Sequence, residues 1–341
     1  MNKKGILLVC AAAAVSWVFS GTPAHAQQIR IATKAPENFA SSQIVKEMTE
    51  EIRAETDGKV RFRIYYGGVK GSGRDLLLKM RSREIQGAEF TAGEASSVVA
   101  DLRVMNIPLT FASYEEVDFV MERMAPLLEK QLEARGYVVL GWLEMGFAYL
   151  MSSEPIASLA DMRGKKVWIP TGDPVGQAAF QAMGVTPIPL TIADVMVALQ
   201  TGQIDTVANS FVGAIALQWH TRVKYVTDKP LLYVYGLLMI TKDSYDRIAE
   251  EHVGTVRATV DKYFAILKED IRKSNLEARE TLGRQGVQFV SVASEQYEQL
   301  REVVQEAMKN IEDKDFSGET LREMEKFLQE HRTAPTAVET P

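Results

Sequence analysis

Apolar positions recur with two different periods along the chain, and the clearest example is the run 159–209. Val167 and Ile169 stand two residues apart, which predicts a strand that places both on one face and Trp168 on the other. Pro170 ends this strand, and apolar residues then recur at helical spacing in two successive segments. A second short strand is predicted at 204–208. The run therefore encodes strand, helix, helix and strand.

Capping residues mark the ends of the two helices. Asp173 stands at an N-cap position and Pro174 at a first helical position. The second helix is predicted to open at Thr191, with Asp194 three residues later as in a capping box, and to close at Gly202. Its expected apolar stripe comprises Ile192, Val195, Met196 and Leu199.

Asn209 follows the second short strand directly, at its carboxyl end. In open α/β sheets, ligands gather outside the carboxyl ends of strands. We therefore expect Asn209 and Trp168 to face one cleft. Trp168 has two interpretations, because an indole offers a ligand an apolar face and one N–H donor but also fills a core well.

The same alternation of strands and helices continues on both sides of this run. We expect strands at 29–32, 59–66, 89–91, 137–142, 231–240 and 288–292, and helices at 41–56, 74–83, 114–134, 244–282, 295–311 and 321–329. Alternating units of this size predict an α/β fold with open, mostly parallel sheets that are flanked by helices.

The order of these elements predicts two lobes that are discontinuous in sequence, because the strand–helix rhythm restarts after Gly146 and the apolar segment 231–240 is long enough to return. Lobe I is expected to contain 27–145 and 235–274, and lobe II 146–234 and 275–330, with one long helix between the lobes. A flexible tail is expected at 331–341, where Thr, Ala and Pro prevail. This connectivity is typical of a hinged clamshell, in which closure of the two lobes traps a ligand.

The first 26 residues have the features of a signal peptide. Lys3 and Lys4 precede an apolar stretch, and Ala24-His25-Ala26 forms a small-x-small cleavage site. The apolar stretch is about 14 residues long, short of the roughly 20 that a membrane span needs. We expect export to the periplasm and cleavage after Ala26, which removes the only cysteine and excludes disulfides from the mature chain.

Charge and motifs exclude several classes of function. The net charge of −6 and the lack of a basic stripe argue against nucleic-acid binding. No later segment is apolar enough to span a membrane. The calcium-loop mimic at 313–318 has Met324 at its twelfth position, and no histidines stand at metal-ligand spacing. We therefore predict no metal, no cofactor and no enzymatic activity, with a periplasmic enzyme kept as a minor alternative.

Three motifs of the central run carry a resemblance to a known family: K-K-V-W-I-P at 165–170, G-V-T-P-I-P-L at 184–190 and D-V-M-V-A-L-Q-T-G-Q-I-D-T-V-A-N at 194–209. They resemble the extracytoplasmic solute-binding proteins of tripartite ATP-independent periplasmic (TRAP) transporters, the dicarboxylate-receptor family. The resemblance implies the clamshell of a periplasmic binding protein. It further implies a small organic acid bound between the lobes and delivery of that acid to a membrane permease.

The resemblance also implies site residues, and this chain departs from two of them. Where Trp168 stands, the family commonly has an arginine that clamps a ligand carboxylate, and a second family arginine falls at or beside Ala148. Asn209 keeps the family's asparagine. We therefore expect an atypical ligand that is more apolar or lacks a clamped carboxylate. An exported sensor or scaffold without a transport role is the alternative.

The remaining candidate ligand contacts stand at strand ends or in adjoining loops. They are the aromatic residues Tyr149, Phe211, Trp142 and Tyr235, the carboxylates Glu144 and Glu94, which accept from hydroxyls or amines, and the cation Lys34. Ordinary core packing is the alternative for the aromatic residues, and surface exposure is the alternative for the carboxylates.

Overall fold

Two long antiparallel strands, β4 (Tyr137–Ser152) and β8 (Tyr225–Thr241), run through the middle of the molecule. The computed structural model describes residues 27–334, so the predicted signal peptide and the last residues of the predicted tail lie outside it. Both strands are longer than predicted. At Gly146 the chain makes a bulge at φ 87° and continues as a strand, where the sequence suggested a break.

The other strands extend this pair on both sides into a seven-stranded sheet of order β2-β1-β3-β8-β4-β7. Beyond β8 lie β3 (Gly87–Thr91), β1 (Gln27–Ala32) and β2 (Val60–Tyr65). These three strands run parallel to one another. Beyond β4 lies β7 (Thr206–Asn209), which is antiparallel to β4. The short β9 (Gln288–Val290) pairs with β8 in parallel.

A separate parallel pair joins β5 (Trp168–Pro170) to β6 (Ile188–Leu190), and Val167 forms a parallel bridge with Thr206 of β7. The predicted alternation is confirmed, because Val167 and Ile169 belong to one core cluster and Trp168 to another. The helix α6 (Pro174–Ala182) follows β5, and Asp173 Oδ1 accepts from the Gly176 N–H at 3.0 Å. The predicted N-cap is therefore confirmed too.

The helix α7 (Val195–Thr201) begins four residues later than predicted. Thr191 donates its hydroxyl proton to the Asp194 carboxylate at 2.6 Å, and neither side chain caps the helix. The predicted capping box is wrong because these two side chains bond each other across a turn. Ile192 consequently lies outside the apolar stripe and is 58% exposed, whereas Gly202 ends the helix in the left-handed conformation as expected.

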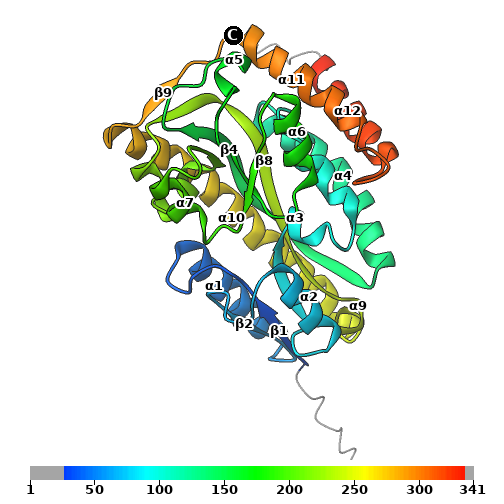
Figure 1. Cartoon of the computed structure of the whole chain (residues 1–341). Helices are drawn as coiled ribbons and strands as arrows, with labels where there is room; N and C mark the ends of the chain where they lie inside the picture. The colour runs from blue at the N-terminus through cyan, green and yellow to red at the C-terminus, as the bar shows by residue number, and fades with distance from the viewer. Residues whose placement is uncertain (1–26, 335–341) are drawn as a thin grey trace, which may run out of the picture.

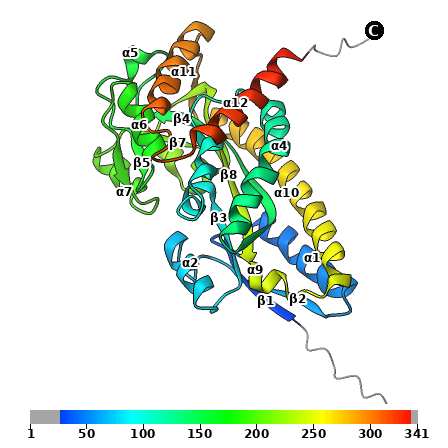
Figure 2. The same ribbon diagram turned by 90° about the vertical axis from the view of Figure 1, so that its right-hand side faces the viewer.

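Helices cover both faces of the sheet (Figure 1). They are α1 (Ala40–Glu55), α2 (Gly73–Arg81), α3 (Ala92–Ala95), α4 (Tyr114–Ala134), α5 (Leu159–Met162), α8 (Phe211–Ala216), α9 (Lys242–Tyr245), α10 (Glu250–Arg284), α11 (Ser294–Lys309) and α12 (Gly318–Thr333), with 3-10 turns η1 (Ala100–Asn106) and η2 (Trp219–Thr221). Figures 1 and 2 place α1 and α2 at one end of the molecule and α5, α6 and α11 toward the other.

The long helix α10 contributes to two separate cores, which confirms the predicted long helix. Val260 and Phe264 pack with strands β1 and β2 and with α1. Ala278 and Leu282, farther along the helix, pack with β7 and α8. The 35 residues of α10 span about 50 Å at the usual helical rise. One continuous helix therefore contacts both ends of the molecule.

The closing helix α12 extends to Thr333, beyond the predicted end at 329. Arg332 donates to both carboxylate oxygens of Glu116 in α4, at 2.7 and 3.0 Å. This bidentate pair keeps the chain helical in the first residues of the predicted tail. Within residues 27–334, no helix has the length and apolar character that a membrane crossing requires.

Replacing Gly146 by alanine is expected to destabilise the fold more than the same change at Gly164. Both glycines have positive φ, 87° and 79°, and share a backbone cost of about 1–2 kcal/mol. A Cβ at Gly146 would also lie 2.9 Å from Asn275 Nδ2 and 3.1 Å from the Tyr114 hydroxyl, whereas one at Gly164 meets nothing within 4 Å.

The overpacking should add about 1–3 kcal/mol to the loss in Gly146→Ala. Urea unfolding of the two variants measures the difference in free energy of unfolding. Equal losses would contradict a tight contact between the bulge in β4 and the long helix.

Candidate functional site

The carboxyl ends of β3 and β7 point toward each other along β4. Thr91, the last residue of β3, pairs with Gly236, which also pairs with Leu143 of β4. Asn209, the last residue of β7, pairs with Tyr149 of the same strand. Six residue steps of β4 separate these two levels, or about 20 Å. Strand ends that face each other in this way are where α/β proteins bind ligands, so we take this region as the candidate site.

The lobe I side of the candidate site is a polar cluster at the ends of β1 and β3. Lys34 Nζ lies 2.5 Å from Glu94 Oε2. Glu94 also forms a capping box with Thr91, since its carboxylate accepts from the Thr91 N–H at 2.9 Å and the Thr91 hydroxyl accepts from the Glu94 N–H. The structure thus brings two predicted site residues together, and each neutralises the other. Burial would raise the pKa of Glu94, but the Lys34 charge and these hydrogen bonds hold it below its usual range.

Glu89 belongs to the same cluster, although the sequence did not identify it as a site residue. The Thr33 hydroxyl donates to its carboxylate. No lysine, arginine or histidine of the described chain lies within 4.0 Å of it, so it has no ion pair. Burial raises the pKa of Glu89, and the Thr33 hydrogen bond and the Lys34 charge offset this only in part. A glutamate between Ala88 and Phe90 in a short buried strand was the available sequence signal.

The lobe II side combines an amide with aromatic rings. The Tyr149 and Phe211 rings stack with centroids 4.2 Å apart and planes 16° from parallel. Asn209 Oδ1 accepts from the Ser210 N–H at 2.8 Å. The Asn209 amide lies directly over Gly213, where a Cβ would come within 2.3 Å of Oδ1, so only glycine fits there. The structure therefore brings the predicted residues Tyr149, Asn209 and Phe211 together.

Trp168 lies behind this side, in the core of lobe II. Its side chain packs edge-on against Trp219 at 5.2 Å and the residue is 8% exposed. Its indole N–H donates to the Leu190 carbonyl at 3.0 Å. In this conformation both the ring and the donor have partners within the protein. A direct ligand contact by Trp168 remains a prediction.

Trp142 and Tyr235 stand within one residue of the level at which β3 ends, but their polar atoms bond within the protein. The Trp142 N–H donates to Glu129 of α4 at 2.8 Å. Tyr235 is 1% exposed, and its hydroxyl donates to the Leu102 carbonyl of η1 at 2.6 Å. Their rings contact each other at 5.9 Å. In this conformation both residues serve the core beneath α4 and η1.

Glu144, the remaining candidate, belongs to a buried ion cluster centred on Arg272 of α10. Arg272 donates to both Glu144 oxygens, at 2.8 and 2.7 Å, and to both Asp118 oxygens of α4, at 2.9 and 2.7 Å. The Glu144 side chain is 3% exposed and also accepts from the Tyr233 hydroxyl at 3.2 Å. Burial would raise the pKa of Asp118, but Arg272 outweighs burial and lowers it. Sequence reasoning missed Arg272, because its partners lie more than 100 residues away in the chain.

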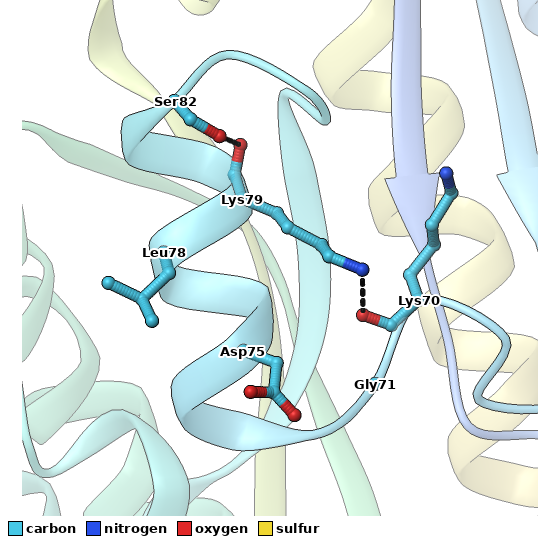
Figure 3. A pocket seen from close by; sticks show the side chains of 6 residues that line it. All are labelled: Lys70, Gly71, Asp75, Leu78, Lys79 and Ser82. Atoms are coloured by element: carbon cyan, nitrogen blue, oxygen red, sulfur yellow. Dashed lines mark hydrogen bonds between the residues drawn. The ribbon is translucent and has the colours of Figure 1, made fainter.

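A surface hollow of about 460 Å³ lies along α2, outside the candidate site (Figure 3). Its two lysines have partners: Lys79 donates to the Lys70 carbonyl at 3.0 Å, and Lys70 pairs with Glu84 at 2.9 Å. Both ammonium groups of the hollow are therefore engaged with acceptors of the protein itself. Between residues 27 and 334, no group of three or more His, Cys, Asp or Glu side chains is arranged to hold a metal ion.

Replacing Trp168 by alanine should lower the free energy of unfolding by about 3–5 kcal/mol, as for other buried tryptophans. Trp168→Phe keeps a ring but loses the bond to Leu190, so a smaller loss of about 1–2 kcal/mol is expected. Chemical unfolding of both variants checks this order. Normal stability of the alanine variant with lost ligand affinity would instead favour the platform interpretation.

Replacing Glu89 by glutamine should stabilise the protein at neutral pH. Because the folded-state pKa of Glu89 is raised above the ordinary value of about 4.3, its ionisation opposes folding. The penalty is absent below about pH 4 and grows as pH rises through the folded-state pKa.

The gain from Glu89→Gln in free energy of unfolding should therefore be larger at pH 7 than near pH 4. Glu306→Gln, on the exposed face of α11, removes the same charge elsewhere and serves as the control. A Glu89→Gln variant that is less stable at pH 7 than the parent would contradict the assignment.

The comparisons with known proteins agree with this geometry. Residues 31–315 match the family model described as bacterial extracellular solute-binding protein, family 7. A TRAP periplasmic solute-binding protein from Ochrobactrum anthropi, with its C-terminus bound in the ligand-binding pocket, has a TM-score of 0.83 and 25% identity. The alignment covers 91% of this chain and 97% of that one.

Two further proteins illustrate the ligands of similar chains. The sugar acid binding protein DctPAm from Advenella mimigardefordensis, in complex with galactonate, has a TM-score of 0.80 and 19% identity over 89% of this chain and 98% of its own. The ectoine/5-hydroxyectoine-binding periplasmic protein UehA of Ruegeria pomeroyi is 22% identical over 68% of this chain and 69% of its own.

These structures confirm the predicted two-lobe α/β fold with its long helix. The family consists of periplasmic binding proteins of transporters rather than of enzymes. The match covers most of the described residues, and it includes the central run whose motifs carry the resemblance. The chain therefore belongs to the family-7 bacterial extracellular solute-binding proteins, the solute receptors of TRAP transporters.

Proposed function

We propose that this chain is the periplasmic receptor of a TRAP-type secondary transporter. It is exported by the segment that ends at Ala26, binds a small organic ligand between lobe I (27–145 and 235–274) and lobe II (146–234 and 275–330), and delivers it to the membrane permease. One observation carries the proposal: two clusters of polar and aromatic side chains stand at strand ends that face each other across β4 and β8.

The ligand contacts that we propose come from both clusters. Lys34 and Glu94 supply one side, and Asn209, Tyr149 and Phe211 the other. Asn209 offers an amide N–H donor, and the stacked rings offer an apolar face. A few polar groups in a largely apolar setting suit a small organic molecule.

The ligand, in this proposal, has no tightly clamped carboxylate. Trp168 stands at the position of one expected arginine and gives its only donor to Leu190. Ala148, at the position of the other, is 2% exposed. Lys34 is already paired with Glu94. A planar guanidinium is the group that selects carboxylates, and neither expected position provides one.

Closure of the lobes requires bending of β4, β8 and α10, the elements that pass between them. Gly146 and the register shifts on either side of it interrupt the β4 ladder where bending is needed. Arg272 ties α10 to β4 at the same level. These contacts support a clamshell whose hinge lies beside the candidate site.

Asn209→Ala should lower ligand affinity by about 10–100-fold, since a lost hydrogen bond in a dry site costs about 1–3 kcal/mol. Asn310→Ala, at the exposed end of α11, is the matched control. Calorimetry gives the affinities, and small-angle X-ray scattering tests whether ligand compacts the parent protein.

The transport role is tested in proteoliposomes that carry the cognate permease subunits. Uptake of the bound solute should require the parent receptor and fall with Asn209→Ala. Ligand binding without any receptor-dependent uptake would favour an exported sensor instead, and binding that leaves the scattering curve unchanged would contradict a clamshell.

A further inference from the structure

The charges at the facing strand ends are predominantly negative. Four carboxylates stand in or after three of these strands: Glu89 within β3, Glu94 after β3, Asp173 after β5 and Asp194 after β6. The only cation in the loop after β1 that contacts any of them is Lys34. This balance is the inverse of a site that binds a dicarboxylate.

Three of the four carboxylates already have a structural role. Glu94 pairs with Lys34 and caps α3. Asp173 caps α6 and Asp194 accepts from Thr191. Glu89 alone has neither a cation nor a helix end, and its single partner is the Thr33 hydroxyl.

The absence of an ion pair at Glu89 matters because of where this residue lies in the fold. It is half-buried in β3, two residues from the carboxyl end of the strand, and it pairs in register with Leu238 of β8. An uncompensated carboxylate that loses water costs free energy. Closure of the two lobes would remove more water from it, unless the ligand itself brings a positive charge.

The opposite side of the candidate site also suits a cation. The Tyr149 ring is partly exposed and stacks on Phe211, and a cationic nitrogen is attracted to the face of an aromatic ring. Trp168 and Ala148 bring no arginine to this side, and Arg279, whose charge acts on Tyr149, lies over the Phe289 ring. The carboxylate on one side and the stacked rings on the other therefore both favour a positively charged ligand.

We propose that Glu89 is a specificity-determining residue that receives a positively charged nitrogen of the ligand, and that the solute is a small organic cation or zwitterion. The proposal rests on the proposed receptor function and names the ligand class for that same site. A positively charged ligand would account both for the absence of the expected arginines and for the absence of an ion pair at Glu89.

The test is a binding panel on the purified mature protein. Cationic and zwitterionic probes are choline, glycine betaine, putrescine and ectoine, and anionic probes are succinate, galactonate and orotate. Choline is paired with 3,3-dimethylbutan-1-ol, which has the same shape without the charge. The protein should bind at least one cationic or zwitterionic probe, and should bind no anion more tightly.

Glu89→Gln should weaken the bound cationic probe at least tenfold, whereas Glu306→Gln should change its affinity less than twofold. If choline is bound, its neutral isostere should bind at least tenfold more weakly. Because Glu89→Gln is expected to be the more stable protein, a thermal melt separates lost binding from lost folding.

Three outcomes would overturn the proposal: tighter binding of an anion, binding of no cationic or zwitterionic probe, or an unchanged affinity in Glu89→Gln. The proposed receptor function is tested separately, by whether a bound probe compacts the protein. An anion that compacts the protein and loses affinity in Asn209→Ala would refute the cation and leave the receptor intact, whereas bound probes that never compact the protein would refute the receptor.

Discussion

The fold depends on two strands and one helix that extend through both halves of the molecule. β4 and β8 pair along nearly their whole length, and α10 packs into cores at both ends of the molecule. Arg272 fastens that helix to Glu144 of β4 and Asp118 of α4 with four charge-assisted hydrogen bonds. The Glu144 side chain is 3% exposed, whereas that of Asp118 is 41% exposed. Removing Arg272 would leave the buried Glu144 without its counter-charge, which typically costs about 3–5 kcal/mol. Relative movement of the lobes must therefore bend these elements near Gly146 while this cluster stays closed.

The candidate site is a consequence of this arrangement. Since β3 ends at one level of the central strand pair and β7 at another, their side chains face each other over a distance that the proposed closure would shorten. Most polar groups there bond within the protein and hold their own side in shape. Glu89 is the exception, because burial raises its pKa and no cation forms an ion pair with it among the described residues. A residue that weakens the free protein but suits a ligand is typical of a binding site.

The sequence predicted the elements with strong local signals and missed those that depend on distant partners. The alternation around Trp168, the cap at Asp173 and the extent of α4 follow from neighbouring residues, and the structure confirms them. The predicted capping box at Thr191 is wrong because two polar side chains bond each other instead of the backbone. Of the predicted site residues, Tyr149, Asn209 and Phe211 lie together, as do Lys34 and Glu94. Arg272 and Leu102, which bind the polar atoms of Glu144 and Tyr235, lie 128 and 133 residues away from them in the chain, so no local pattern indicates them. The partner of Trp142, Glu129, lies 13 residues away but in a different element, α4.

The most direct measurement is native mass spectrometry of the receptor purified gently from its own periplasm, followed by identification of the molecule it retains. The account predicts one small organic molecule per protein, with a positively charged nitrogen, that is lost from Asn209→Ala and depleted from Glu89→Gln. A retained dicarboxylate or sugar acid without such a nitrogen, held equally by Glu89→Gln, would contradict it.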